Sequence, residues 1–254
     1  MSGRVNVLGV GVSPINMPMA LDQLGEWIAR GDRQYVSVCN VHSVMECRRD
    51  ARLRQIVNHA GMTTPDGMPL VWLARLSGQR HVSRVYGPDL MLAEMDHSQK
   101  TGHTHFFYGG RSGVADRLAA TMRRRFPGVR IVGTFTPPLA TAEELCNPQT
   151  ASLINDTHPD IVWVGVSSPK QEFWMACMRP LLQARVLVGV GAAFDFHAGT
   201  ALQAPRWMQR GGLEWLFRLM TEPRRLWRRY LIDNPWFLYE LGRQKLGLKR
   251  YDLG

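Results

Sequence analysis

The sequence predicts an α/β fold in which helices cover both faces of an open, mainly parallel sheet. Strand-like and helix-like segments alternate through the first 200 residues. The strand-like segments are short, rich in Val and Ile and apolar on both faces, as buried parallel strands are. Strand signals stop beyond Phe196, and a basic, mainly helical segment follows. This alternation is typical of open sheets with right-handed crossovers.

The elements follow one another in an order that divides the chain into two units. The predicted strands are Val5–Val12, Gln34–Val38, Gly61–Thr64, Thr104–Tyr108, Val129–Thr134, Ile161–Gly165 and Val186–Val190. The predicted helices are Pro18–Arg30, Asp50–His59, Met68–Ser77, Pro88–Ser98, Val114–Phe126, Thr141–Thr157 and Gln171–Leu182. Asp89 and Thr141 lie near helix starts, and Pro127-Gly128 closes one helix. We therefore expect an α/β domain over residues 1–200 and a helical, basic and aromatic appendage over residues 201–254.

Composition indicates a soluble globular protein with anionic partners. Of the 254 residues, 45% are apolar and 20% charged, which argues against wholesale disorder. The formal net charge is +10, so nucleic acid, a phosphorylated substrate or an acidic membrane surface are the partners to consider. Residues 205–254 carry 11 basic and 5 acidic residues and four of the eight tryptophans. That mixture suits an anionic membrane surface, although a helical tail with packed aromatics and solvated arginines gives the same composition.

Several classes of protein are disfavoured. The four cysteines show no paired spacing, which argues against a zinc site and a disulfide scaffold and favours a reducing cytosol. No apolar run approaches the roughly 18 residues of a spanning helix, and the N-terminus is a poor signal peptide. Gly9-Val-Gly11 follows the first strand, but Pro14 occupies the third glycine position, which disfavours a nucleotide-dependent oxidoreductase. The chain holds no Asp-x-Asp, so the usual carboxylate pair for a metal-bound nucleotide sugar is missing.

Candidate site residues follow the predicted strands, because ligands of open α/β sheets bind outside the carboxyl ends of the strands. Asp66, in Pro65-Asp66-Gly67, is placed to take a proton from a substrate hydroxyl, or it serves only a turn or a helix cap. The other candidates are binding residues: Gly110 in a loop that can cradle phosphate, Lys170 and Gln171 at a helix start, Gly191, and Asp195 for a nucleotide. A tight turn, a solvated first helical turn and a local cap are their respective alternatives.

The appendage offers cations for a diphosphate. Arg218, Arg225 and Arg228 are spaced i, i+7 and i+10, which places them on one face of a continuous helix. Pro223 interrupts such a helix. We expect these three arginines to face the donor diphosphate, with Arg224 and Arg229 pointing elsewhere, toward lipid. The appendage is thus expected both to complete the active site and to contact a membrane.

A set of short motifs occurs in one order along nearly the whole chain, from about Val5 to Tyr230. The motifs are Asn40, Thr64-Pro-Asp-Gly67, Arg84-Val-Tyr-Gly-Pro-Asp-Leu90, Phe107-Tyr-Gly-Gly110, Pro169-Lys-Gln-Glu172, Gly189-Val-Gly-Ala-Ala-Phe-Asp195 and Gly212-Leu-Glu-Trp-Leu-Phe-Arg218. Together they resemble the WecG/TagA/CpsF family of bacterial glycosyltransferases. No single motif carries the resemblance.

The resemblance implies a Rossmann-like fold and an inverting, metal-independent transfer that needs no cofactor. The donor is then a UDP-sugar of the N-acetylmannosamine or glucose type, and the acceptor a polyprenyl-diphosphate-linked saccharide in cell-surface or exopolysaccharide biosynthesis. Asp66 matches the family's general base, Asn40, Arg84 and Gln171 match polar pocket residues, and Asp195 matches a nucleotide contact. The resemblance also implies a cytoplasmic enzyme that is peripheral on the inner face of the bacterial membrane. Nucleic acid is not an expected partner, and a homo-oligomer is compatible with the resemblance.

One position departs from the family pattern. Many members carry a Thr two residues before the Asn, where this chain has Val38, flanked by Ser37 and Cys39. A hydrogen bond from that position is therefore in doubt. A nucleic-acid-binding module is the main alternative from another class, because of the basic and aromatic tail, but it leaves Asp66 and the Gly-rich loops unexplained.

Overall fold

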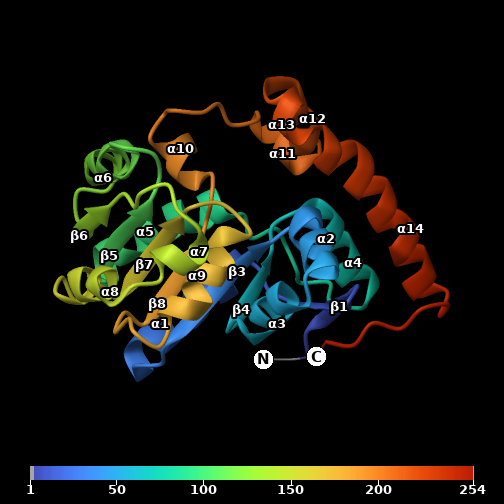
Figure 1. The fold of residues 1–254 in the computed structure, drawn as a ribbon, viewed down its shortest axis with the longest axis horizontal. Coiled ribbons are helices and arrows are strands. Elements are labelled where there is room, and N and C mark those ends of the chain that lie inside the picture. Colours follow the sequence, from blue (N-terminus) through green and yellow to red (C-terminus); the bar gives the residue numbers. More distant parts are fainter. Residues whose placement is uncertain (1–2, 254) are drawn as a thin grey trace.

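A six-stranded parallel sheet forms the centre of the molecule (Figure 1). The structure, a computed structural model, describes residues 3–253, apart from the side chain of Arg225. The strands are β3 (Gln34–Cys39), β4 (Met62–Pro65), β5 (Thr104–Gly109), β6 (Arg130–Phe135), β7 (Ile161–Gly165) and β8 (Val186–Gly189). They lie in the order β4-β3-β8-β7-β5-β6, with every neighbouring pair parallel. The predicted open, Rossmann-like α/β sheet is confirmed.

Helices cover both faces of this sheet, and alternate residues of each strand feed two apolar clusters. In β7, Ile161 and Trp163 face one cluster while Val162 and Val164 face the other. The first cluster packs against α1 (Met17–Arg30), α5 (Gly87–Thr101), α6 (Val114–Arg125) and α10 (Ala193–His197). The second packs against α7 (Ala142–Leu145), α8 (Pro148–Asn155) and α9 (Lys170–Met178). Burial on both faces is why the strand sequences are almost continuously apolar.

The N-terminal segment differs from its prediction. Val5–Val12 is an antiparallel hairpin of β1 (Val5–Val7) and β2 (Val10–Val12), outside the main sheet. Leu8 and Gly9 both have positive φ angles, of 52° and 88°, and reverse the chain between the two strands. The prediction of one strand was wrong because an apolar run gives no sign of such a reversal.

A third apolar cluster lies under this hairpin and three helices, α2 (Val41–Arg49), α3 (Ala51–His59) and α4 (Met68–Leu76). The sequence analysis missed α2, which begins where Asn40 accepts a hydrogen bond from the Ser43 backbone N–H at 3.2 Å. Asn is a strong N-cap residue, so the signal was present. The predicted helix over Thr141–Thr157 is two helices, because Asn147 caps α8 and Pro148 stands in its first turn.

The appendage is helical and lies along one side of the molecule, as the orange and red ribbon of Figure 1 shows. Its helices are α11 (Arg206–Arg210), α12 (Glu214–Thr221), α13 (Pro223–Arg228) and α14 (Asn234–Lys245), with a π-helical turn η1 (Arg229–Asp233) before α14. The break at Glu222 before Pro223 removes the continuous helix on which three arginines were expected to share a face. The division at residue 200 stays a prediction.

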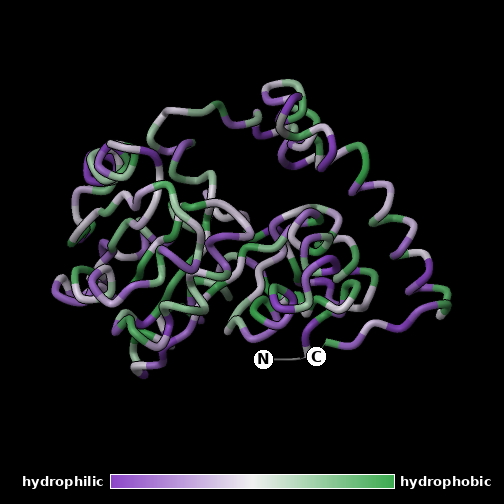
Figure 2. Tube along the Cα trace, in the orientation of Figure 1, coloured by the Kyte–Doolittle hydropathy of each residue, from purple (hydrophilic) through white to green (hydrophobic). Residues whose placement is uncertain are grey.

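Polar contacts tie the appendage to the hairpin and to α2. Arg49 pairs with Asp233, and Nη1 of Arg48 lies 3.0 Å from Oε1 of the buried Glu240. Nδ2 of Asn6 donates to the Tyr251 carbonyl at 2.6 Å, so the last residues return to the hairpin. Figure 2 shows that hydrophobic and hydrophilic residues are interspersed along the appendage. Among the described residues, we find no helix with the length and apolarity needed to span a bilayer.

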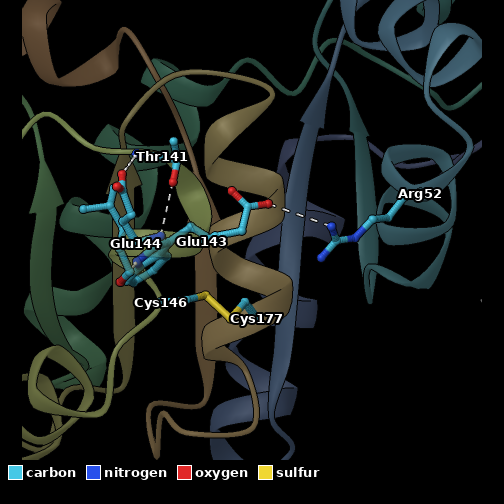
Figure 3. The surroundings of a disulfide bond; sticks show 8 residues. Arg52, Thr141, Glu143, Glu144, Cys146 and Cys177 are labelled. Atoms are coloured by element: carbon cyan, nitrogen blue, oxygen red, sulfur yellow. Dashed lines mark hydrogen bonds and ion pairs between the residues drawn. A yellow bond between two sulfur atoms is a disulfide. The ribbon is translucent and has the colours of Figure 1, made fainter.

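A disulfide between Cys146 and Cys177 joins the end of α7 to α9 (Figure 3). Cys39 and Cys47 are buried free thiols. The spacing of the cysteines had argued against a disulfide scaffold, and it gave no sign of this single bond. The two cysteines are 31 residues apart and meet only because α7 packs on α9, a contact that no local pattern reveals.

Candidate active site

The candidate site lies at the carboxyl edge of the sheet. Asn40 follows β3 and Asp66 follows β4, and these neighbouring strands pair Cys39 with Pro65 at their ends. Gly191 follows β8, and Gln171 stands in the first turn of α9, after β7. The parallel topology therefore brings residues far apart in sequence to one edge, which is where ligands of open α/β sheets bind.

Asp66 is buried, and two residues, Asn40 and Arg84, make polar contacts with it. Nδ2 of Asn40 donates to its Oδ2 at 3.2 Å, and Nη2 of Arg84 lies 3.7 Å from its Oδ1. Nε of Arg84 also donates to the Asp66 carbonyl. The cap residue of the following helix α4 is Gly67, and no side chain caps that helix. The Asp66 side chain therefore does not cap α4.

Burial sets the protonation of Asp66. Loss of solvation raises the pKa of its carboxyl from 3.8 to about 6. The Arg84 guanidinium and the Asn40 hydrogen bond lower that pKa, and the Glu214 carboxylate raises it. Oδ1 of Asp66 is buried and accepts no hydrogen bond from the described residues. Asp66 is thus ionised at neutral pH, with one oxygen available to accept a proton.

Glu214 of α12 brings the appendage into this site. It pairs with Nη2 of Arg84, and its Oε1 accepts a hydrogen bond from the Tyr86 hydroxyl at 2.8 Å. The Arg84 guanidinium also lies over the Tyr86 ring, 3.9 Å from its centroid. Sequence analysis did not single out Glu214, although it lies inside a quoted motif. The motif itself does not indicate which residues of the α/β region Glu214 contacts.

A second appendage residue, Arg229 of η1, contacts Asn40, and its charge acts on Asp66. Its Nη2 donates to Oδ1 of Asn40 at 3.4 Å. From the sequence we expected Arg229 to point toward lipid. In the structure it contacts Asn40 instead. The π-helical turn that carries it could not be predicted from a straight helical wheel.

Of the three appendage arginines that were predicted to bind diphosphate, Arg218 and Arg228 make their contacts with residues other than Asp66. Arg218 lies over the Phe196 ring, 5.9 Å from its centroid, and 3.7 Å from Glu222. Arg228 is exposed beside the ring of Trp227. The side chain of Arg225 lies outside the described residues. The break between α12 and α13 separates Arg218 from the other two.

Gln171 and Glu172 are buried beside the ends of β7 and β8. Nε2 of Gln171 donates to Oε1 of Glu172 at 3.1 Å, whereas Oε1 of Gln171 has no partner among the described residues. A Cβ on Gly189 would lie 2.9 Å from the Gln171 amide, so only glycine leaves it room. Burial raises the pKa of the Glu172 carboxyl. A buried amide oxygen without a partner, beside Gly191, indicates a place for a ligand donor.

The remaining predicted binding residues make local contacts. The N–H of Gly110, at a φ of 75°, donates to the Gly165 carbonyl at 3.0 Å. Nζ of Lys170 donates to the Ala140 carbonyl at 2.7 Å. Oδ1 of Asp195 accepts a hydrogen bond from the Thr200 hydroxyl at 3.0 Å. These contacts fit the alternatives of a tight turn and a local cap, and they leave a ligand role for the three residues untested.

One cluster next to the site has the composition of a metal site. His42, Glu46 and Asp233 offer ligand atoms within 4.8 Å of one another. Arg49 pairs with both Glu46 and Asp233, and burial together with the Arg229 guanidinium lowers the pKa of His42 to about 4. These guanidinium groups already neutralise the carboxylates and would repel a cation. The cluster therefore joins α2 to η1 as an ion-pair network.

Comparisons with known proteins agree on one family. The family model described as "Glycosyl transferase WecG/TagA/CpsF family" matches residues 5–251. An N-acetylglucosaminyldiphosphoundecaprenol N-acetyl-beta-D-mannosaminyltransferase of Bacillus spizizenii is 32% identical over 197 residues, which are 78% of this chain and 74% of the relative. A Bacillus subtilis protein of the same name is 26% identical over 238 residues, or 91% of each chain.

Proposed function

The chain belongs to the WecG/TagA/CpsF family and is a glycosyltransferase, and from this premise we propose that it transfers a sugar from a UDP-sugar to a saccharide linked through diphosphate to a polyprenol. The relatives are named for transfer of N-acetylmannosamine to N-acetylglucosaminyldiphosphoundecaprenol, which supports a lipid-linked acceptor here. The observation that carries the proposal is the buried Asp66 carboxylate between Asn40 and Arg84.

The proposed reaction is a single displacement with inversion. The acceptor hydroxyl oxygen forms a bond to C1 of the donor sugar while the bond from C1 to the phosphate oxygen breaks. The hydroxyl proton passes to Oδ1 of Asp66, and UDP leaves with the bonding electron pair. A carboxyl with a pKa of about 6 is ionised at neutral pH and still basic enough to accept this proton. Asn40 holds the other carboxylate oxygen and so fixes the orientation of the base.

Guanidinium groups supply the charge that a departing diphosphate needs. Arg84 lies next to the Asp66 carboxylate, and Arg229 contacts Asn40, which itself donates to Asp66. Arginine matches phosphate oxygens bidentately and does not lose its charge in proteins. The missing Asp-x-Asp motif supports a metal-independent transfer in which arginines take the part of the metal.

The nucleotide is proposed to lie over β8 and β7. The unpartnered Oε1 of Gln171 can accept a hydrogen bond from an N–H of the uracil ring, and Gly191 lies beside it without a side chain. Asp195, in the helix that follows Gly191, then takes the ribose hydroxyls once it releases Thr200. This arrangement places the donor sugar toward Asp66.

The appendage is proposed to dock the enzyme on the inner face of the membrane. Exposed basic residues such as Arg224 and Lys245 face an anionic leaflet, where each contributes roughly 1 kcal/mol near the surface. Large apolar side chains that are 44–76% exposed recur along it: Trp207, Met220, Trp227, Leu231, Ile232, Trp236, Leu238, Tyr239, Leu246 and Leu248. Such a surface is typical of helices that lie in a membrane interface.

Transfer and nucleotide binding test the proposal together. A panel of UDP-sugars is incubated with a synthetic short-chain prenyl-diphosphate N-acetylglucosamine, and radiolabelled or mass-shifted product is followed. UDP should also raise the melting temperature in EDTA as much as in Mg²⁺. Product from at least one UDP-sugar is expected. Failure with every donor, or stabilisation by UDP only when metal is present, would count against the mechanism.

A further inference from the structure

A cavity of about 280 Å³ lies between α4 and α11, next to the candidate base. Its lining residues are Met68, Val71, Arg75, Ser83, Arg84, Asp89, Arg206, Gln209 and Arg210. Arg84 connects this cavity to Asp66, because its Nη2 lies 3.7 Å from the Asp66 carboxylate. A ligand in the cavity is therefore separated from the base by a single guanidinium group.

The lining is strongly cationic. Arg206 and Arg210 stand one turn apart on α11, are exposed, and have no ion pair or side-chain hydrogen bond within residues 3–253. Nε of Arg75 donates to the Val82 carbonyl at 2.8 Å, which anchors the side chain and leaves its two terminal amino groups to a ligand. Asp89 is the one carboxylate of the lining, and it can accept hydrogen bonds from sugar hydroxyls. Arg84 serves the donor diphosphate in the proposed mechanism, so Arg75, Arg206 and Arg210 are the arginines of this cavity that match a further anion with several oxygens.

We propose that this cavity binds the diphosphate of the lipid-linked acceptor, with Arg206 and Arg210 as its principal contacts. The inference rests on the proposed function and names the subsite for one of its two substrates. Neither arginine belongs to the set that sequence analysis assigned to the donor diphosphate.

The position of the cavity favours the acceptor over the donor. β4 is the edge strand of the sheet, and α4 follows it, whereas Gln171 and Gly191 lie beyond β3, toward β8 and β7. Asp66 thus stands between the cavity and the proposed nucleotide site. In a displacement with inversion, the attacking hydroxyl and the leaving diphosphate occupy opposite faces of the donor sugar. The acceptor must therefore reach the donor sugar from the side away from the nucleotide, and the cavity is on that side of the sheet edge.

Apolar surface beside the cavity suits a lipid chain. Trp72 and Leu76 of α4 are 49% and 80% exposed, and Trp207 of α11 is 67% exposed. A Cβ on Gly212 would lie 3.4 Å from the Trp72 ring, so the chain after α11 packs directly on α4. A diphosphate held by Arg206 and Arg210 would pass its prenyl chain to these exposed side chains.

The test compares two acceptors with the double variant Arg206→Gln and Arg210→Gln. With the prenyl-diphosphate saccharide, the acceptor KM is expected to rise at least tenfold while the KM for the UDP-sugar stays unchanged. With the same sugar as a simple alkyl glycoside, which lacks the diphosphate, the variant should match the wild-type enzyme. The matched control is Arg117→Gln with Arg124→Gln, two exposed arginines of α6 whose loss changes the net charge equally.

A binding measurement separates this inference from the proposed function. Calorimetric titration with the prenyl-diphosphate saccharide, in the absence of donor, should show at least tenfold weaker binding to the variant than to wild type and control. If binding is weakened in this way but the wild-type enzyme transfers no sugar, the assignment of the cavity stands and the proposed function is overturned. Transfer with an unchanged acceptor KM, or an equal loss with both acceptors, would overturn the cavity assignment and leave the proposed function standing.

Discussion

The α/β body, residues 3–200, and the appendage, residues 201–253, are stabilised in different ways. Two apolar clusters bury the residues on the two faces of the main sheet. In the described part of the appendage, Leu226, Tyr230 and Phe237 are the large apolar side chains that are fully buried, and many others are exposed. Ion pairs from Asp233 and Glu240 to α2 fasten it instead. We therefore expect the body to fold by itself, and the appendage to dock on the body and, as proposed above, on a membrane surface.

The candidate site contains residues of both regions. Asp66 and Asn40 come from the body, and Glu214 and Arg229 come from the appendage. The proposed base thus belongs to the body, but the charged groups around it include appendage residues. The predictions below separate these two contributions.

Removing the appendage should have the largest effect. A chain that ends at residue 200 keeps the whole sheet, which is complete at Gly189, and should stay folded with a cooperative thermal transition, while its far-UV circular dichroism falls because helices α11–α14 are removed. It loses Glu214, Arg229 and the exposed apolar surface. We expect almost no transfer, even to a water-soluble acceptor, and no flotation with anionic liposomes.

Two outcomes would contradict this picture of the appendage. Full turnover of a soluble acceptor by the truncated chain would make the appendage an anchor alone. Unchanged flotation would remove its membrane role. With the full-length chain, flotation should weaken at high salt, because screening shortens the range of charge-driven docking.

The second prediction addresses the body alone. Asp66→Asn keeps the shape of the side chain and removes the base, so turnover should fall by roughly 10²- to 10⁴-fold. UDP binding should persist, as measured by the melting shift. Near-normal turnover at saturating donor would reduce Asp66 to a turn residue.

The same variant should alter the pH dependence of stability. The raised pKa of Asp66 means that the folded state holds its proton between about pH 4 and 6, where the unfolded state releases it. Stability contributed by this group is therefore lost as pH rises through that window. Asp66→Asn should flatten the corresponding part of a plot of melting temperature against pH.

The third prediction loosens the attachment between the two regions. Glu240 is 1% exposed and lies near Arg48, Arg243 and Lys249. Glu240→Gln leaves the largely buried Arg48 without its counter-ion, so limited proteolysis of α14 should become several-fold faster and transfer should fall less than on truncation. Glu26→Gln, which removes a surface pair with Arg30, is the control and should change neither measurement. Unchanged proteolysis would mean that apolar contacts fasten α14.

The sequence predicted the body better than the parts that depend on the appendage. The main-sheet strands were located to within a residue or two. Each is buried on both faces and is therefore an almost continuous apolar run, which the sequence shows directly. Asp66 and Gln171 could be proposed because carboxyl ends of parallel strands converge, and Asn40 was proposed through the family resemblance. The hairpin reversal at Leu8 was missed because the residues around it are as apolar as those of a continuous strand. Glu214 and Arg229 reach Asp66 only through the docking of a distant segment, which no local pattern encodes.

The smallest expected effect is the most specific test of how the appendage acts on the base. Glu214 raises the pKa of Asp66, and it also pairs with Arg84, whose guanidinium lowers that pKa. Glu214→Gln removes a negative charge and frees Arg84 to move closer to Asp66, so both consequences act in the same direction. The pKa of Asp66 should fall, and the base should stay ionised in more acidic solution.

The acid limb of a plot of kcat/KM against pH reports this change. In the wild-type enzyme it should lie near pH 6, and in Glu214→Gln it should move down by roughly half a pH unit. Glu143→Gln removes a carboxylate paired with Arg52, far from Asp66, and should leave the limb in place. If Glu214 served only to hold α12 on the body, the variant would lose activity equally at every pH. A limb that moves while the maximum rate is largely kept would instead show that docking of the appendage tunes the base.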